Sequence, residues 1–264
     1  MKLLVMGAGN MTKALFCPVK EFFKEHEVHF YTPSGTRAES LALEMGQNTI
    51  EISEESELKG FDAVFLGCKP QNLPVVGELL SNKFKKPPKL ILSIMASRKF
   101  NQINEIFPNV PVMRLMPNMP CFVGSGVMPY VCSPDVPFEL REIFVGAFSK
   151  SSSLVFVSNE KTFDQITPVL GSGPGLIFEI CKSFEQELID LSLGEDLSRK
   201  LVSELFKGSA ELSLGQEKSF TTLAEEVSSP GGVTEKMLET YQQVSMSENF
   251  KKIFAEGRVR GDSL

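Results

Sequence analysis

Lys2-Leu-Leu-Val-Met-Gly-Ala-Gly-Asn-Met-Thr12 is the segment from which the fold class of this 264-residue chain can be inferred. Its first five residues form a short apolar run, which is typical of a buried parallel strand. A glycine-rich turn follows, and apolar residues then recur at helical spacing over 14–16. Strand, turn and helix in this order place a pyrophosphate on a helix N-terminus. Gly7 would make the tight turn and Gly9 would admit the phosphate, whereas Thr12 departs from the usual third glycine.

The end of the second predicted strand, residues 28–31, indicates which dinucleotide binds. A carboxylate there would bind the ribose 2′-hydroxyl of NAD. This sequence instead has Thr32-Pro-Ser34-Gly-Thr36-Arg37, whose hydroxyls and arginine suit the 2′-phosphate of NADP. Arg37 could also be only the exposed start of the next helix. The turn therefore favours NADPH, with NADH as the alternative.

Strands and helices alternate over residues 1–158. Further strands are predicted at 63–67, 89–94, 110–115, 127–132 and 154–157, and helices at 37–45, 74–80, 99–107 and 138–148. This alternation predicts an α/β fold with a doubly wound, Rossmann-type parallel sheet. Ligands of such sheets lie outside the carboxyl ends of the strands. The loops to consider are 7–11, 67–71, 95–97 and 116–120. Lys69, in the second of them, is either directed at this crevice or a solvated loop lysine.

No strand pattern follows residue 158. The helices predicted there span 160–170, 176–193, 196–214, 235–243 and 248–257. We therefore expect a dinucleotide-binding domain at 1–158 and an all-helical domain at 159–264. These few helices carry large apolar faces and cannot cover one another fully. The helical domain should thus complete its core against a second copy of the chain, in a homodimer or higher oligomer.

Ser228-Ser-Pro-Gly-Gly-Val-Thr234 interrupts the helical domain. Pro230 should end the preceding helix, and the two glycines permit a close approach to the backbone. Thr234 is expected to open a new helix, whose free N–H groups and hydroxyl could hold a small carboxylate. The same residues could equally form nothing more than a turn between two helices.

The composition excludes several classes of function. The net charge is −6 and the 27 Lys and Arg residues are scattered, which argues against a nucleic-acid surface. Two histidines, His26 and His29, give little basis for a metal site, so none is expected. The five cysteines form no C-x-x-C pair, which is typical of reduced residues in a cytoplasmic protein. No apolar run is long enough for a signal peptide or membrane span.

Several motifs stand in a fixed order: Gly7-Ala-Gly-Asn-Met11, Lys69-Pro-Gln71, Ser93-Ile94, Arg114 with Met116-Pro-Asn118 and Pro120, Gly124 and Gly126, Gly171-Ser-Gly-Pro174, and Ser229-Pro-Gly-Gly232 with Thr234. Together they resemble the Δ1-pyrroline-5-carboxylate reductase family over nearly the whole chain. Many dinucleotide enzymes share the first motif, whereas the last two together are specific. The resemblance implies a Rossmann domain followed by a helical dimerisation domain, with NAD(P)H as hydride donor.

The resemblance, together with the loops above, assigns roles to individual residues. The expected cofactor-binding residues are Met6, Gly7, Ala8, Gly9, Asn10, Met11, Ser34, Thr36, Arg37, Ser53, Cys68, Lys69, Pro70, Met95 and Ala96. The expected substrate-binding residues are Met116, Pro117, Asn118, Ser172, Gly173, Gly232, Val233 and Thr234. Thr234, which would hold the substrate carboxylate, and Glu217, which matches a position near the ring nitrogen, are the catalytic candidates.

Four positions depart from the family's pattern. Val233 replaces a frequent threonine, Gly175 an alanine, Thr12 a small residue, and Ser53 a common asparagine. If backbone N–H groups hold the carboxylate, Val233 costs little. If the missing hydroxyl matters, turnover suffers or the substrate differs.

The resemblance implies reduction of 1-pyrroline-5-carboxylate to L-proline, the last step of proline biosynthesis. A protonated cyclic imine is already an electrophile, so orientation against the cofactor would supply most of the rate enhancement. One alternative is a reductase of another cyclic imino acid. A second is an NADPH-sensing dimer without turnover, although Lys69 and Thr234 favour the enzyme. A third, a β-hydroxyacid dehydrogenase, would use Lys161 or Lys182, but Gly-Ser-Gly-Pro is not its pattern.

Overall fold

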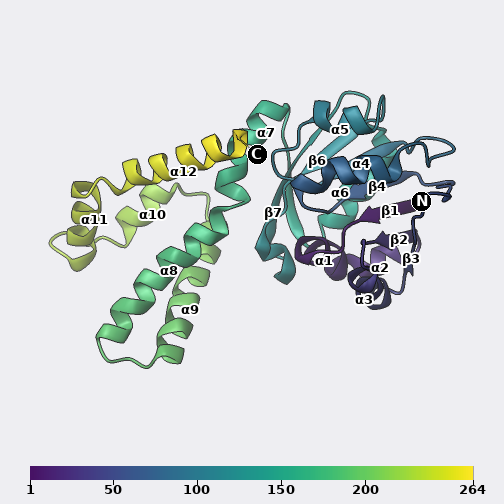
Figure 1. The fold of residues 1–264 in the computed structure, drawn as a ribbon. Coiled ribbons are helices and arrows are strands. Elements are labelled where there is room, and N and C mark those ends of the chain that lie inside the picture. Colours follow the sequence, from purple (N-terminus) through teal and green to yellow (C-terminus); the bar gives the residue numbers. More distant parts are fainter. Residues whose placement is uncertain (264) are drawn as a thin grey trace. The chain divides into compact units, whose positions relative to one another are not determined.

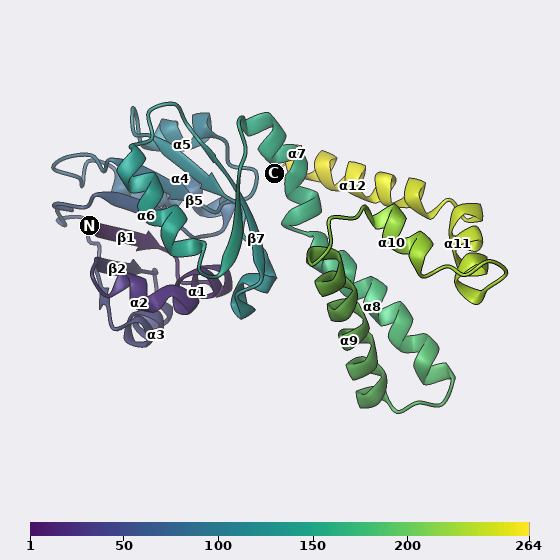
Figure 2. The ribbon, with the colours of Figure 1, turned by 180° about the vertical axis from the view of Figure 1, so that it is seen from behind.

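The computed structural model describes residues 1–263, and Figures 1 and 2 show its ribbon from two sides. Backbone contacts divide the chain into two compact units. Unit 1 comprises Met1–Pro174 together with the residues from 257 onward, and unit 2 comprises Gly175–Glu256. These units differ from the predicted halves, because α7 (Glu160–Leu170), expected in the helical domain, has its contacts in unit 1.

An eight-stranded sheet forms the centre of unit 1, in the order β3-β2-β1-β4-β5-β6-β7-β8. Its strands are β1 (Lys2–Met6), β2 (Glu27–Tyr31), β3 (Asn48–Thr49), β4 (Ala63–Leu66), β5 (Leu90–Ser93), β6 (Val112–Leu115), β7 (Gly126–Cys132) and β8 (Ser152–Phe156). The parallel, doubly wound arrangement is confirmed for β1 to β6. However, β7 runs antiparallel to β6, because the connection 116–125 holds only a short 3₁₀ turn and no crossover helix.

Successive side chains of each strand point to opposite faces of this sheet, and each face has its own core. Leu3 and Val5 of β1 belong to one buried cluster, and Leu4 and Met6 belong to the other. The first face is covered by α1 (Asn10–Phe16), α2 (Lys20–Phe23), α3 (Thr36–Met45) and α6 (Phe138–Phe148), and the second by α4 (Leu73–Leu80) and α5 (Phe100–Ile106). The continuous apolar runs of the central strands thus reflect burial on both faces.

Unit 2 is entirely helical over its described residues. It contains most of α8 (Gly173–Asp190) and α12 (Met246–Asp262), and all of α9 (Glu195–Leu214), α10 (Phe220–Glu226) and α11 (Val233–Gln243). The expectation that Thr234 opens α11 is wrong by one residue. Val233 begins the helix and Gly232 is its N-cap, since the extended backbone of Gly232 precedes the first turn.

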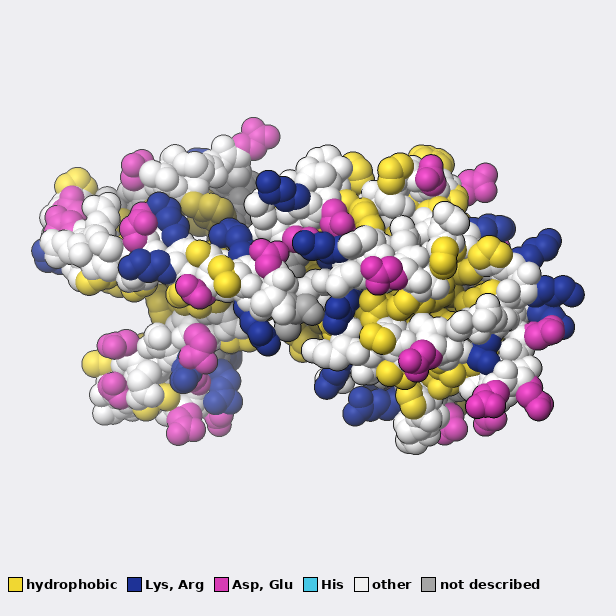
Figure 3. All heavy atoms as spheres, turned by 45° about the horizontal axis from the view of Figure 1, so that its top comes forward, with side chains coloured by type: hydrophobic (Ala, Val, Ile, Leu, Met, Phe, Trp, Pro, Cys, Tyr) yellow, Lys and Arg dark blue, Asp and Glu magenta, His cyan; other side chains and the backbone are white. Residues whose placement is uncertain are grey.

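Apolar side chains in unit 2 are largely open to solvent. Only Ser198 and Val202 are buried there, whereas Phe178, Leu205 and Met237 are more than half exposed. Helices α8, α9 and α11 line an apolar groove of about 640 Å³ that includes Phe184 and Leu201. Figure 3, a view of one face, shows hydrophobic side chains at the surface among the helices. Within residues 1–263, no helix is long and apolar enough to cross a bilayer.

Candidate active site

The glycine turn after β1 has the shape that a dinucleotide requires. Gly7 has φ +108°, and a Cβ added to it would lie 2.7 Å from the Cys68 nitrogen, so only glycine fits. Gly9 is the extended N-cap of α1, and a Cβ there would meet no heavy atom within 4 Å. Open space therefore lies over Gly9, next to the N–H groups of Asn10 and Met11 that no side chain caps. The cradle fits a pyrophosphate.

Thr12 replaces the usual third glycine of the fingerprint, and Gly67 compensates for its larger side chain. Thr12 is fully buried, and its Oγ1 has no hydrogen-bond partner among the described residues. A Cβ added to Gly67, just after β4, would lie 2.4 Å from this oxygen. The close packing that a third glycine normally permits in α1 is thus provided by Gly67 on the facing segment. Sequence reasoning missed this role, because the two positions are far apart in the chain.

The residues expected at the adenosine end surround the start of α3. Gly35 is the N-cap, with φ +73°, and the Thr36 hydroxyl donates to the Ser34 carbonyl oxygen at 3.4 Å. Ser34, Thr36 and Arg37 are exposed, and no carboxylate in the described chain pairs with Arg37. Ser53 follows β3 and binds the Ser56 hydroxyl through both its N–H, at 2.9 Å, and its own hydroxyl, at 3.1 Å. Ser34, Thr36 and Arg37 therefore lie together at the N-terminus of α3.

The loops after β4 and β5 lie next to each other at the carboxyl edge of the sheet. Arg98 donates from Nε to the Pro70 carbonyl oxygen at 3.0 Å and joins the two loops. Burial raises the pKa of the Cys68 thiol to about 11, so this group is neutral at pH 7. Lys69 is exposed, whereas Met95 is buried and donates its N–H to Ser93 Oγ at 3.2 Å. Ala96 follows in the same loop. The order of β1, β4 and β5 thus brings the predicted cofactor residues to one edge.

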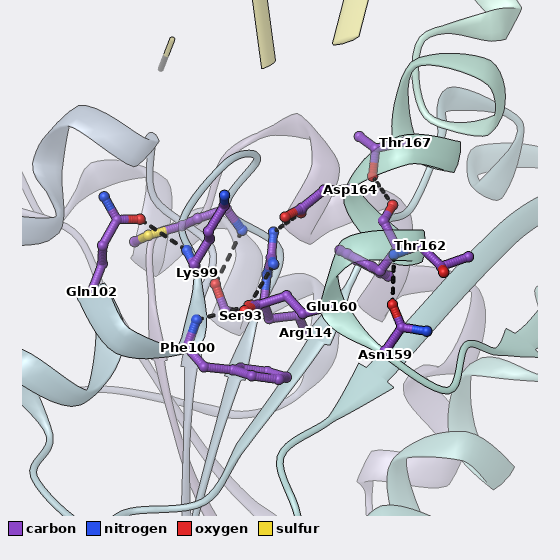
Figure 4. A network of polar contacts seen from close by, with 12 residues as sticks. Ser93, Lys99, Phe100, Gln102, Arg114, Asn159, Glu160, Thr162, Asp164 and Thr167 are labelled. Carbon is purple, nitrogen blue, oxygen red and sulfur yellow. Dashed lines mark hydrogen bonds and ion pairs between the residues drawn. The ribbon is translucent and has the colours of Figure 1, made fainter. Parts of the chain in front are cut away.

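A buried arginine joins this edge to α7 (Figure 4). Arg114 of β6 is 1% exposed, and its Nη1 and Nη2 lie 2.6 Å from Glu160 Oε1 and 2.8 Å from Asp164 Oδ1. Its guanidinium also lies 4.8 Å from the centre of the Phe163 ring. Glu160 Oε1 additionally accepts the N–H of Phe100, the first residue of α5, at 2.8 Å. The network therefore connects β6, α5 and α7. The loop that contains Met95 and Ala96 leads directly into α5.

Asn118, one of the expected substrate residues of unit 1, joins the loop after β6 to the end of α7. Its Nδ2 donates to the Leu170 carbonyl oxygen at 3.0 Å, and its Oδ1 accepts the Val127 N–H at 3.1 Å. Met116 packs against the break between α7 and α8, since a Cβ at Gly171 would lie 3.1 Å from Met116 Cγ. Pro117 is buried, whereas Ser172 is exposed and Gly173 is partly buried. The Asn118 amide thus holds the loop after β6 against the segment that precedes Ser172.

In unit 2, the turn before α11 exposes an N-terminal helix end. Gly231 has φ +73°, and Gly232 donates its N–H to the Ser229 carbonyl oxygen at 2.9 Å. Val233 is 79% exposed, and Thr234 is partly buried. Glu217 is exposed in the segment between α9 and α10, and in the described chain it makes no hydrogen bond to residues 232–234. The structure therefore does not join Glu217 to this turn.

No group of three or more His, Cys, Asp or Glu residues between 1 and 263 is arranged to hold a metal ion. The polar groups at the predicted cofactor positions are instead backbone N–H groups, hydroxyls and the exposed side chains of Lys69 and Arg37. This donor set suits phosphates and carboxylates.

Two family models match separate parts of the chain. One, described as "Pyrroline-5-carboxylate reductase dimerisation", matches residues 160–264. The other, described as "NADP oxidoreductase coenzyme F420-dependent", matches residues 2–97. The two matches correspond to the helical segment and to the glycine cradle with its neighbouring strands.

Two similar proteins align with nine-tenths or more of this chain. Pyrroline-5-carboxylate reductase of Staphylococcus haemolyticus is 28% identical over 257 residues, which cover 95% of this chain and 93% of that protein. The enzyme of Pasteurella multocida is 26% identical over 244 residues, 90% of this chain and 88% of that protein.

Solved structures share the fold. The 1-pyrroline-5-carboxylate reductase of Streptococcus pyogenes has a TM-score of 0.86 at 22% identity and covers 100% of this chain and 99% of that one. The Plasmodium falciparum pyrroline carboxylate reductase, solved with NADP bound, has a TM-score of 0.81 at 23% identity, with 100% and 97% covered. Both likenesses concern the backbone arrangement.

Proposed function

The chain belongs to the pyrroline-5-carboxylate reductase family, and from this membership we propose that it reduces 1-pyrroline-5-carboxylate to L-proline with NADPH, as the last step of proline biosynthesis. The observation that carries the proposal is the presence, on one chain, of a dinucleotide cradle and a helical segment that matches this family's dimerisation model. Relatives that span nine-tenths or more of the chain carry the same enzyme name.

The cofactor would be held by the carboxyl edge of the sheet. We propose that residues 6–11 bind the pyrophosphate, with Cys68, Lys69, Pro70, Met95 and Ala96 alongside. The hydroxyls of Ser34 and Thr36 and the Arg37 guanidinium would bind the 2′-phosphate, and Ser53 would lie near the adenosine. When bound, NADPH supplies the hydride. The neutral Cys68 thiol packs in this edge without adding charge to it.

The substrate is proposed to bind through its carboxylate. The N–H groups of Val233 and Thr234, at the positive end of α11, and the Thr234 hydroxyl would hold it. Glu217 would accept the hydrogen bond of the protonated ring nitrogen and so stabilise the iminium form. Met116, Pro117, Asn118, Ser172, Gly173 and Gly232 would shape the ring pocket. Orientation of an activated imine then accounts for the absence of a strong acid–base residue in these roles.

The enzyme is proposed to act as a homo-oligomer in the cytoplasm. The exposed apolar faces of α8, α9 and α11 belong to the segment that matches the dimerisation model. Apolar surface of this extent on a monomer is a marker of a protein interface. The self-association should therefore use the C-terminal helices.

One assay tests the proposed function against its alternatives. Purified protein is mixed with NADPH, and oxidation of NADPH is followed after addition of 1-pyrroline-5-carboxylate. Parallel reactions contain a piperideine carboxylate or ketopantoate. Oxidation specific to the pyrroline supports the proposal, and preference for the piperideine would identify another cyclic imino acid. NADPH binding without oxidation by any of them would identify a sensor.

Thr234→Ala is expected to raise the KM for 1-pyrroline-5-carboxylate about tenfold or more, because a hydrogen bond to a charged group contributes about 1.5–3 kcal/mol. The KM for NADPH should change little. Thr240→Ala, in the same helix, is the matched control, since the Thr240 hydroxyl donates to the Lys236 carbonyl oxygen of its own helix at 2.9 Å. Equal losses for both ligands in steady-state kinetics would contradict the placement of Thr234.

Arg37→Ala is expected to raise the Kd of NADPH about tenfold while leaving that of NADH nearly unchanged. The reason is that only NADPH carries the 2′-phosphate, and an exposed charge-assisted hydrogen bond contributes on the order of 1.5 kcal/mol. Titration calorimetry with both dinucleotides measures the difference. Arg141→Ala, which removes a partly exposed arginine from α6, is the control. A parallel loss for NADH would show that Arg37 does not select the phosphate.

A further inference from the structure

The turn before α11 contains a carboxylate that the proposed mechanism does not use. Glu235 is the third residue of α11, and its Oε2 accepts the N–H of Gly231 at 2.8 Å. This hydrogen bond joins the first turn of α11 to the turn 229–232, in which Gly231 has φ +73°. A backbone at this φ suits glycine far better than other residues, so the turn has a particular conformation to maintain. Glu235 holds that conformation from the helix side.

The first turn of α11 differs from a capping box. In that motif the N-cap side chain accepts the N–H of the third helical residue, and the third side chain accepts the N–H of the N-cap. Here the N-cap is Gly232, which has no side chain, and its N–H donates to the Ser229 carbonyl oxygen at 2.9 Å. Glu235 reaches one residue further back, to Gly231. The N–H groups of Val233 and Thr234 are therefore left without a capping acceptor in the described chain.

We propose that Glu235 is a positioning residue for the substrate carboxylate, an inference that rests on the proposed function. By holding the Gly231 N–H, it fixes the turn 229–232, so that the amides of Val233 and Thr234 remain directed at one anion. This arrangement also explains how a valine is accommodated at 233. With the turn held from Glu235, backbone donors and the Thr234 hydroxyl grip the carboxylate without a second hydroxyl.

The negative charge of Glu235 opposes the binding of an anionic substrate at this helix end. A carboxylate in the first turn shares the positive helix end with the substrate and repels it, although Glu235 is exposed and solvent screens the repulsion. Two substitutions separate the two effects. Glu235→Ala removes both the acceptor and the charge, whereas Glu235→Gln keeps an amide oxygen that can accept the Gly231 N–H and removes only the charge.

The test compares two imines that differ only in the carboxylate, namely 1-pyrroline-5-carboxylate and 1-pyrroline. Glu235→Ala is expected to raise the KM for the first about five- to tenfold, less than the loss of a whole charge-assisted hydrogen bond, because the donors to the carboxylate remain and only their alignment is lost. The kcat, the KM for NADPH and kcat/KM for 1-pyrroline should stay within about twofold of wild type, the scatter of a surface substitution. Glu235→Gln should restore the KM to the wild-type value or below it. Glu239→Ala, one turn further along and paired with Lys236 at 2.9 Å, is the control.

Competitive inhibition gives the same comparison from the product side. Glu235→Ala should weaken inhibition by L-proline and leave inhibition by pyrrolidine, which lacks the carboxylate, unchanged. Equal effects of Glu235→Ala on the two imines, an unchanged KM, or failure of Glu235→Gln to restore it would overturn the role of Glu235. A wild-type protein that oxidises NADPH with neither imine would overturn the proposed function itself, and this inference with it.

Discussion

Arg114→Ala is expected to lower the free energy of unfolding by about 3–5 kcal/mol, because removing one partner of a buried ion pair leaves the other charges uncompensated. The guanidinium is 1% exposed, and its two partners, Glu160 and Asp164, are only 23% and 21% exposed. Loss of the arginine also removes its contact with the Phe163 ring. Two partly desolvated carboxylates would then lie side by side on α7 without a cation.

Urea unfolding at a fixed protein concentration measures this loss. Far-UV circular dichroism is the suitable signal, because the chain contains no tryptophan and only three tyrosines. Arg141→Ala is the control, since its ion pair with Glu142 is exposed and should contribute no more than about 1 kcal/mol. A loss for Arg114→Ala as small as that of the control would show that the network does not hold α7 to the sheet.

The ion-pair partners of Arg114 could not be predicted from the sequence. Arg114 was identified only as part of a family motif, and its partners lie 46 and 50 residues further along the chain. Nothing local distinguishes Glu160 and Asp164 from the exposed acids at similar spacing on other helices. The pairing becomes visible only when β6 and α7 come together, because a long-range ion pair leaves no periodic pattern in the sequence.

Elements that depend on local patterns were predicted well. The predicted bounds of β1, α6 and α7 are confirmed, since apolar runs and helical periodicity depend on neighbouring residues alone. The direction of β7 was missed because it depends on how far the connection 116–125 can reach, not on the pattern of the strand itself. The two-residue β3 was missed because it is too short to show a period.

The candidate site likewise contains features that local sequence predicts and features that it does not. The glycine cradle could be predicted because backbone conformation and one open helix end suffice to form it. The start of α11 was placed one residue late, since its N-cap is a glycine and not a residue with a hydroxyl. The roles of Glu217, Val233 and Thr234 come from the family resemblance and stay predictions, because an imine carboxylate leaves no local signature as specific as the cradle's.

Gly67→Ala is expected to destabilise the protein and to weaken NADPH binding together. The added Cβ would lie 2.4 Å from Thr12 Oγ1, 2.9 Å from the Phe65 ring and 3.1 Å from the Gly7 carbonyl oxygen. Overpacking of a buried site typically costs about 1–3 kcal/mol, and relief here must displace either α1 or the Gly7 turn. Because both carry the proposed pyrophosphate site, we expect the Kd of NADPH to rise about tenfold, the equivalent of 1.4 kcal/mol.

A second substitution should reverse much of this effect. Thr12→Ala removes the oxygen that Gly67→Ala would meet, and that oxygen has no hydrogen-bond partner within residues 1–263. The double variant should therefore be more stable than Gly67→Ala, with a coupling energy of about 1 kcal/mol or more in a double-mutant cycle. Gly146→Ala in α6, whose added Cβ meets no heavy atom within 4 Å, controls for glycine replacement itself. If Thr12→Ala fails to rescue either stability or the Kd, the packing of Thr12 on Gly67 does not substitute for the third glycine.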